Sequence, residues 1–525
     1  MVSVVIHPWR VGVLYGAMHK EQRYYSAAVF LLSSVVLAVI TIWLLQHHYI
    51  SDFALSRWAK VLGILDAPES RLEYFGLIYP HIPAYILMPF YFLPGLKTGA
   101  APYLISIIIG AALLAFWNQH MANKGYSTRV RVALIILVAS HPFFLWSVTG
   151  GTYRALSLAM FYILYLSLAR LIYERDVRAF IMLGLTLAMY FFIDERTFYL
   201  FAALLPLLPL VAPPKMMEES AISVYVVVII PLFIAVSAWA YLNWIFVDDS
   251  LHFLTAPESA FRGAWRDAPY LPWLNTFGGT LVMPTILAIA VSIVAYPVLI
   301  VLLVHASRHA LLLRATIVLL VHAILATGMA TYGFFLSHPA DMLFLFSSGL
   351  MAGIVLMPRE SHKAIRITMV MTLVSVLGGW LVFLWKPTPE MDQWATAIQG
   401  KPPVIRYDNE IDLGVWLARN RMPTLIDDHN AYRVIVARGD ARQLILPFSS
   451  DFKINLLRPV LSIRQVVVPD PSWRGGARDL INKRYPDLYQ NGMAGFELVY
   501  DQDHWRAYRR INDTSVKDDV ARPSI

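Results

Sequence analysis

The sequence predicts an all-α polytopic membrane domain of about 11 transmembrane helices, followed by a small C-terminal α/β soluble domain. Two observations predict the membrane domain: 58% of the 525 residues are hydrophobic, and only 15% are charged. A soluble domain usually carries about 25% charged residues. A third observation, a tail rich in Asp, Arg and Asn after residue 386, indicates a separate domain. We therefore expect a membrane domain over residues 1–386 and a soluble domain over residues 387–525.

Long apolar segments supply the expected spans. The segments 27–43, 224–239 and 281–304 contain no charged residue. A span needs roughly 20 apolar residues, because lipid offers the backbone no hydrogen-bond partner. Many apolar segments follow the first one, so we interpret it as a true span and not as a cleaved signal peptide. The expected spans are 28–46, 101–118, 132–148, 154–173, 178–193, 198–212, 221–244, 277–304, 313–334, 341–356 and 367–386.

Short basic segments between the spans predict the orientation, because cytoplasmic loops are enriched in Lys and Arg. This rule also explains the net charge of +8 without a nucleic-acid partner, and it leaves membrane lipids as expected partners. The basic segment 1–26 predicts a cytoplasmic N-terminus, and an odd number of spans then places the C-terminal domain outside. We therefore expect a multi-pass protein of the bacterial inner membrane. The basic segments are 1–26, 124–131, 173–178, 308–314 and 359–366.

Segment 78–96 is apolar enough to cross the membrane, but a crossing conflicts with this orientation. It would move the basic loop 124–131 to the outside. The segment also contains four prolines, which interrupt the backbone hydrogen bonds of a helix. We therefore expect a juxtamembrane or re-entrant segment on the outer side, with a true crossing as the alternative. The prolines are Pro80, Pro83, Pro89 and Pro94.

The tail alternates short apolar runs with helix-like stretches, a pattern typical of a small α/β domain. Helices are expected at 410–420 and 477–485. The short apolar runs, which favour strands, are 424–426, 433–436, 443–446 and 465–468. No internal repeat of fixed period is visible in the tail or in the membrane domain.

Several kinds of chemistry are excluded by what the chain lacks. It contains no cysteine, which rules out disulfides, thiolate metal sites and cysteine nucleophiles. It also contains no P-loop, no dinucleotide glycine fingerprint and no Gly-x-Ser-x-Gly elbow. A nucleotide-dependent mechanism is therefore unsupported, and no cofactor is expected.

The first outer loop carries the candidate general base. Asp52 follows the first span directly. A carboxylate at a membrane surface can act as a base when partial burial raises its pKa. A helix cap or a solvated loop charge is the competing structural interpretation. The further candidate substrate-binding residues of this loop are Arg71, Glu73, Tyr79 and His81.

Two short turns place charges between apolar segments, where a charge marks either a functional site or an internal ion pair. Asp194, Glu195 and Arg196 form the first turn, and Arg196 is a candidate phosphate ligand because its guanidinium matches phosphate oxygens. The alternative is a simple turn with a local ion pair. Arg154, next to Tyr153, is a second candidate phosphate contact, with an interfacial anchor pair as the alternative.

Two histidines, His252 and His338, also lie in expected outer loops. Together with nearby carboxylates they suit a metal ion, but their spacing matches no known metal motif. Hydrogen bonds to a sugar or a phosphate need the same side chains. We therefore expect no metal and take both histidines as candidate substrate-binding residues.

The order of these features resembles the GT-C superfamily of polytopic glycosyltransferases, which use polyprenyl-phosphate-linked sugars. Lipid A aminoarabinose transferases and protein O-mannosyltransferases are typical members. Asp52 stands where the family has its acidic base, and 79–83 resembles the family's proline-rich juxtamembrane segment. The resemblance covers about residues 1–390, and the stretches 140–146, 149–154, 193–196, 243–246 and 251–254 are similar to later family features.

One departure from the family concerns the base itself. Many members have paired acidic residues in the first loop, whereas Phe53 follows Asp52 here. Glu69 and Glu73 are therefore substitutes for Asp52 in this role.

The resemblance implies transfer of a sugar from a polyprenyl-phosphate donor to a lipid, glycan or protein acceptor on the outer face. Asp52 would deprotonate the acceptor hydroxyl, and Arg154, Arg196 or Arg71 would stabilise the leaving phosphate. The alternatives are a membrane transporter or flippase, and a non-catalytic subunit for an envelope polysaccharide or glycolipid. Missing internal repeats and charges gathered at one face argue against a transporter.

Overall fold

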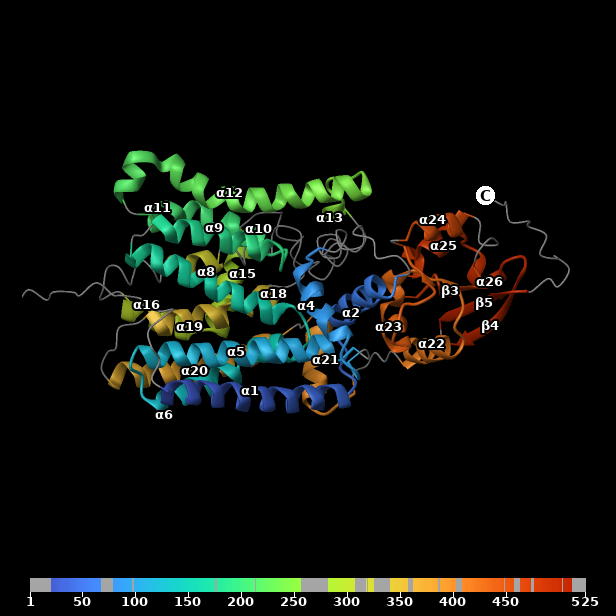
Figure 1. Cartoon of the computed structure of the whole chain (residues 1–525). Coiled ribbons are helices and arrows are strands. Elements are labelled where there is room, and N and C mark those ends of the chain that lie inside the picture. Colours follow the sequence, from blue (N-terminus) through green and yellow to red (C-terminus); the bar gives the residue numbers. More distant parts are fainter. Residues whose placement is uncertain are drawn as a thin grey trace, which may run out of the picture. The chain divides into compact units, whose positions relative to one another are not determined.

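The chain divides into two compact units, which are described separately with the labels of Figure 1. Unit 1 contains Met1–Ala54, Phe75–Leu87 and Pro102–Val404, and unit 2 contains Leu55–Tyr74, Met88–Ala101 and Ile405–Ile525. The expected boundary after residue 386 stays a prediction. The computed structural model describes residues 20–67, 79–96, 99–174, 177–212, 214–255, 282–306, 318, 320–324, 340–356, 362–385, 388–402, 408–447, 449–457, 463–473, 476–502 and 504–511.

Among the described residues, 5 helices are long and apolar enough to cross a membrane. At 1.5 Å per residue, about 20 helical residues match the thickness of the hydrocarbon layer. Several apolar side chains of α1, among them Leu31, Leu32 and Val39, are exposed, as expected for a helix that faces lipid. The five helices are α1 (Lys20–Gln46), α5 (Ala101–Asn123), α8 (Arg154–Glu174), α12 (Pro214–Val247) and α20 (His362–Leu384).

A sixth candidate span consists of two helices, α6 (Thr128–Ala139) and α7 (Pro142–Thr149), which are bent by 73° at the break between them. Proline at the first position of α7 has no N–H and disfavours helical backbone in the residue before it, so the helix restarts there. His141 lies at the break, with its Nε2 3.1 Å from the carbonyl oxygen of Ala295. The expected span 132–148 is therefore a bent pair and not one straight helix.

The other helices of unit 1 are shorter than the five long helices. The described helices confirm a mostly helical chain with 5 candidate membrane spans, whereas the count of about 11 spans stays a prediction. Most of the expected span 313–334 lies outside the described residues. The shorter helices are α4 (Ile82–Tyr91), α9 (Val177–Phe191), α10 (Thr197–Leu204), η1 (Leu205–Leu207), α11 (Leu208–Val211), α13 (His252–Thr255), α15 (Val282–Ala295), α16 (Val298–Ala306), α18 (Ala340–Leu343), α19 (Phe346–Leu356) and α21 (Pro389–Ile398).

The described part of segment 78–96 contains one helix, α4, which has 10 residues with Pro89 inside it. A helix of this length reaches about 15 Å, roughly half of the hydrocarbon thickness. Helix α4 alone is therefore too short to cross a membrane. This length favours the juxtamembrane or re-entrant interpretation over a true crossing.

Unit 2 contains a five-stranded mixed sheet in the order β2-β1-β3-β5-β4. Figure 1 labels three of its strands, β3, β4 and β5. Strand β1 pairs in parallel with β2 and β3, whereas β5 pairs antiparallel with β3 and β4. Every residue of β3 is buried, which indicates that both faces of the sheet are covered at its centre. The predicted combination of helices and a small sheet near the C-terminus is confirmed, and the limits of a separate soluble domain stay a prediction. The strands are β1 (Thr424–Leu425), β2 (Leu444–Ile445), β3 (Gln465–Pro469), β4 (Phe496–Gln502) and β5 (Trp505–Arg510).

One expected strand of the tail is wrong, because residues 433–436 form part of helix α23 (Asp428–Arg438). Asp427 caps its N-terminus by accepting a hydrogen bond from the backbone N–H of His429, and Gly439 ends it in the left-handed conformation at φ 82°. These two caps outweigh the β-branched residues between them. The remaining helices of the tail are α22 (Asp408–Arg419), α24 (Ser450–Leu457), η4 (Gly476–Arg478), α25 (Leu480–Arg484) and α26 (Leu488–Asn491).

Candidate active site

Asp52 is the first residue of helix α2 (Asp52–Leu65), and its side chain is half-buried. The residue before it, Ser51, is fully buried and held on two sides. Its backbone N–H donates to the Tyr103 hydroxyl at 3.0 Å, and its hydroxyl donates to Oε1 of Glu390 at 2.9 Å. The hydroxyl of Tyr49 lies 3.4 Å from the same Glu390 oxygen. The start of α2 is therefore fixed by groups from distant parts of unit 1.

Arg154 forms the other half of this arrangement. It is 5% exposed, and its Nη2 donates to Oε2 of Glu390 at 3.0 Å. Its guanidinium lies 3.7 Å from the centre of the Trp146 ring and 5.7 Å from the centre of the Phe53 ring, so both aromatic faces attract the cation. Consequently Ser51 and Phe53, the two neighbours of Asp52, both contact the Arg154–Glu390 pair. We call Asp52, Ser51, Phe53, Arg154 and Glu390 the base cluster, after the candidate base Asp52.

Helix α21 positions Glu390 in its first turn, and the sequence explains why the helix begins there. The Thr388 side chain caps it by accepting from the Met391 N–H at 3.3 Å, and Pro389 occupies the first turn. One turn later the Trp394 indole donates to the Thr149 hydroxyl at 3.0 Å. We did not predict Glu390 as a site residue, although the Thr-Pro-Glu helix start and the apolar spacing after it signal a buried amphipathic helix.

A second group of charges lies in the turn between α9 and α10. Asp194 is fully buried and accepts hydrogen bonds from the Ser157 hydroxyl at 2.5 Å and from Nη1 of Arg196 at 2.9 Å. The backbone N–H of Arg196 donates to the same carboxylate at 2.9 Å. Arg196 is itself 5% exposed. The local ion pair that we considered as the structural alternative for this turn is therefore present.

Glu195 in the same turn differs from Asp194, because its side chain keeps 16% of its surface exposed. The Tyr153 hydroxyl donates to its two carboxylate oxygens at 2.9 and 3.0 Å. Burial and the neighbouring Asp194 carboxylate raise the pKa of Glu195 above its ordinary value. Since Tyr153 is adjacent to Arg154, the base cluster and this turn meet at one point of the chain, the start of α8.

Tyr79 and His81 pack among aromatic side chains. Tyr79 is buried with its ring centre 5.0 Å from that of Phe191 and 5.5 Å from that of Phe253. The His81 ring stacks on Trp239 at 4.0 Å with an interplanar angle of 10°. Burial lowers the pKa of His81 to about 4, so its imidazole is neutral at physiological pH.

The remaining predicted site residues are not brought into this arrangement by any described contact. His252 begins α13, and its Nδ1 lies 3.9 Å from a carboxylate oxygen of Asp249. Arg71, Glu73 and His338 lie outside the described residues, as does Glu69. Their roles stay predictions.

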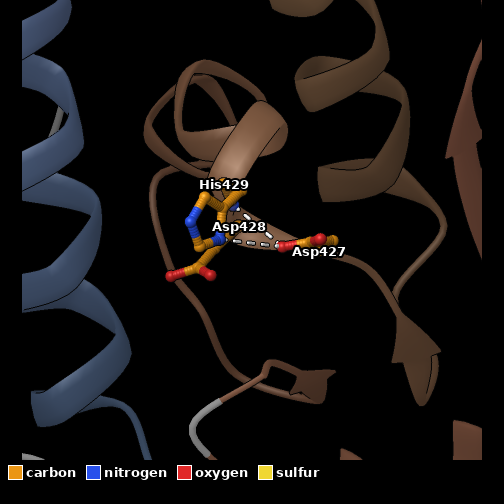
Figure 2. Close-up of side chains that lie close together, drawn as sticks. All are labelled: Asp427, Asp428 and His429. Carbon is orange, nitrogen blue, oxygen red and sulfur yellow. Dashed lines mark hydrogen bonds and ion pairs between the residues drawn. The ribbon is translucent and has the colours of Figure 1, made fainter. Parts of the chain in front are cut away.

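Unit 2 contains a group with possible metal ligands, Asp427, Asp428 and His429, whose ligand atoms lie within 4.8 Å of one another (Figure 2). Protein groups already bind its oxygens. Asp427 accepts from the backbone N–H of His429 at 3.0 Å and from that of Leu480 at 2.8 Å. The Lys60 ammonium lies 2.5 Å from Oδ2 of Asp428. These contacts make the group a helix cap and an ion pair.

The sequence matches no family model and no curated protein. In structure the chain is similar to ArnT from Cupriavidus metallidurans bound to undecaprenyl phosphate, with a TM-score of 0.52 and 12% identity over 92% of this chain and 98% of that chain. For apo ArnT the TM-score is 0.50 with 13% identity over the same shares of both chains. ArnT is a GT-C lipid A aminoarabinose transferase, so the predicted GT-C resemblance is confirmed at the level of the fold.

Proposed function

We propose that this chain is a membrane glycosyltransferase that moves a sugar from a polyprenyl-phosphate donor to an acceptor on the extracytoplasmic face. The observation that carries the proposal is the base cluster, in which both neighbours of Asp52 contact the ion pair between the buried Arg154 and the partly exposed Glu390. The fold supports it, because the similar ArnT structure contains undecaprenyl phosphate. The competing structural role is a charge at a helix start, since Asp52 lies in the first turn of α2, and the transfer assay below separates the two roles.

In the proposed reaction Asp52 acts as the general base. Its carboxylate takes the proton of the acceptor hydroxyl, and the acceptor oxygen forms a bond to the anomeric carbon of the sugar. The bond between that carbon and the phosphate oxygen breaks, and its electron pair leaves with the polyprenyl phosphate. Asp52 suits this role because it keeps solvent-accessible surface at the N-terminus of α2, while its neighbours are held in place.

The leaving phosphate needs positive charge, and two arginines of the described structure lie near the site. Arg196 is matched by two carboxylates: the fully buried Asp194, which also binds its backbone, and Glu195 at 3.5 Å. Arg154 is matched by Glu390, whose side chain keeps 14% of its surface exposed. We therefore assign the phosphate contact to Arg154 and a structural role to Arg196. A preorganised guanidinium stabilises leaving-group charge most when water is excluded.

The proposal includes the cellular setting expected for such a donor. The chain would lie in the bacterial inner membrane with its N-terminus in the cytoplasm and its C-terminal domain outside, as the basic loops predict. A lipid, glycan or protein hydroxyl on that side would be the acceptor. Glu195 and Tyr153, beside Arg154 and partly exposed, are the described groups that could bind sugar hydroxyls.

The test is sugar transfer by the purified full-length chain in proteoliposomes. Undecaprenyl-phosphate-linked sugars with a radioactive label are offered with envelope extracts as the acceptor source. We expect label in an acceptor and release of undecaprenyl phosphate from the wild-type chain, and neither from Asp52→Ala. Movement of labelled donor across the bilayer without transfer would instead support a flippase, and transfer by Asp52→Ala at the wild-type rate would remove Asp52 as the base.

A further inference from the structure

We propose that Glu390 is a positioning residue of the transfer site, which aligns the candidate base Asp52 with the candidate phosphate ligand Arg154. The inference rests on the proposed function and adds to it a residue from the segment after the last long helix. Its basis is that one carboxylate contacts two segments that lie 339 and 236 residues away in the sequence. In the proposed mechanism Glu390 acts through Ser51 and Arg154, and it does not itself contact the acceptor or the phosphate.

The two oxygens of Glu390 have different tasks. Oε1 accepts from the Ser51 hydroxyl at 2.9 Å, next to Asp52. Oε2 accepts from Nη2 of Arg154 at 3.0 Å. Because the carboxylate is rigid and planar, these two contacts set the distance and direction between the start of α2 and the guanidinium. A carboxylate suits this bridge well, since both of its oxygens accept hydrogen bonds and its charge balances the arginine.

Docking of helix α21 does not depend on Glu390 alone. Trp394 is fully buried, donates to Thr149, and has its ring centre 6.0 Å from that of Trp380 and 5.4 Å from that of Phe383. Met391 is also fully buried. These contacts keep the helix in place when the carboxylate is changed. An effect of losing the Glu390 bridge can therefore be distinguished from an effect of losing the fold.

Substitution of Glu390 tests the bridge. Glu390→Gln removes the negative charge that balances Arg154. Its NH₂ group can only donate, so the hydrogen bond from the Ser51 hydroxyl to a carboxylate oxygen is lost when the amide oxygen accepts from Arg154. We expect kcat for sugar transfer to fall about 10- to 100-fold, the order of loss that follows a small misplacement of reacting groups. The KM for the undecaprenyl-phosphate-linked donor should change less than about 3-fold, because Arg154 keeps its contact with Trp146.

Two further variants identify positioning as the cause. Glu390→Asp restores a carboxylate and should recover part of kcat. Ser51→Ala should lower kcat in the wild-type background but add little to Glu390→Gln, because both changes break the same contact. The matched control is Glu410→Gln in unit 2, where Glu410 is buried and lies 3.5 Å from Arg433. This control should leave kcat unchanged.

The outcomes separate the inference from the function on which it rests. No transfer by the wild-type chain overturns the proposed function and this inference with it. Transfer by the wild-type chain with an unchanged kcat in Glu390→Gln overturns only the inference. If Glu390→Gln fails to fold, Ser51→Ala decides: a lowered kcat with the wild-type melting temperature supports the bridge, and an unchanged kcat overturns it.

Discussion

The two ends of helix α2 carry carboxylates with contrasting surroundings. Asp66, just after the helix and within unit 2, has a side chain with 0% exposure. It accepts from the Tyr91 hydroxyl at 2.5 Å, from the Ala441 N–H at 2.8 Å and from Nε of Arg442 at 3.4 Å. Asp52, at the start of the helix in unit 1, is half-buried. Asp66 is thus fully buried and held by three protein groups, whereas Asp52, the proposed base, keeps part of its surface exposed.

The same contrast separates the two arginines of unit 1. Arg196 is bound twice by the fully buried Asp194 and also lies 3.5 Å from the partly exposed Glu195. Arg154 is bound by the partly exposed Glu390 beside the candidate base. We propose that the fully buried Asp194 holds Arg196 in a structural role, whereas the Arg154–Glu390 pair lies where the substrate binds. The predictions below test this distinction, starting from the largest expected effect.

The first prediction concerns the fully buried pair. Asp194→Asn removes the fully buried charge that pairs with Arg196 at 2.9 Å and leaves the partly exposed Glu195, at 3.5 Å, as its remaining carboxylate partner. We expect a loss of about 3–5 kcal/mol in the free energy of unfolding, the range for breaking a buried ion pair on one side. Denaturant unfolding in mixed micelles measures it. A wild-type unfolding free energy together with lost transfer would show that Asp194 belongs to the site and not to the scaffold.

The second prediction concerns the partly exposed pair. Arg154→Gln should lower kcat/KM for the donor about 10²- to 10³-fold, because it removes a positive group from the leaving phosphate. Arg433→Gln is the control, since Arg433 forms a buried pair with Glu410 in unit 2. Equal losses of transfer in both variants would mean that Arg154 acts through stability alone.

The third prediction concerns the ion pair at the middle of α2. Lys60→Met removes the ammonium 2.5 Å from Asp428 and keeps most of the side-chain volume. We expect a loss of about 1–3 kcal/mol in the unfolding free energy, because the buried Asp428 loses its charged partner. Sugar transfer per folded molecule should stay unchanged. The exposed Lys453→Met is the control and should change neither quantity.

The smallest effect is expected at the surface of unit 2. Arg421 lies 2.7 Å from Asp440, but its side chain is 51% exposed. Because solvent screens such a pair, it contributes only about 0–1 kcal/mol to the free energy of unfolding. Arg421→Ala should therefore lower this free energy by less than Lys60→Met does. A larger loss of unfolding free energy in Arg421→Ala than in Lys60→Met would contradict the claim that burial determines how much an ion pair stabilises the fold.

The sequence was sufficient for the features that depend on local pattern. Helix α1 ends at Gln46 as expected, because one continuous apolar run sets its length. The β-branched run 433–436 favours a strand by propensity, but the Asp427 cap and Gly439 at the two ends make it part of helix α23. The bend before Pro142 was missed for a similar reason, since hydropathy counts apolar residues and ignores the proline.

For the site, the sequence supplied Asp52, Arg154 and the 194–196 turn as separate candidates. Their connection could not be predicted, because Glu390 lies 236 residues from Arg154 and no local pattern encodes so distant a contact. The assignment of residues after 386 to a soluble tail also removed Glu390 from consideration. Packing of α21 by Trp394 and Met391 is what brings it to the base cluster.

The most direct test of the account is a paired measurement on Asp52→Asn and Asp66→Asn, with sugar transfer and melting temperature recorded for both proteins. We predict that Asp52→Asn loses about 10²- to 10⁴-fold in kcat, the range for removal of a general base, and keeps its melting temperature. Asp66→Asn should melt at a lower temperature and keep its kcat per folded molecule. Wild-type transfer by Asp52→Asn would contradict the account.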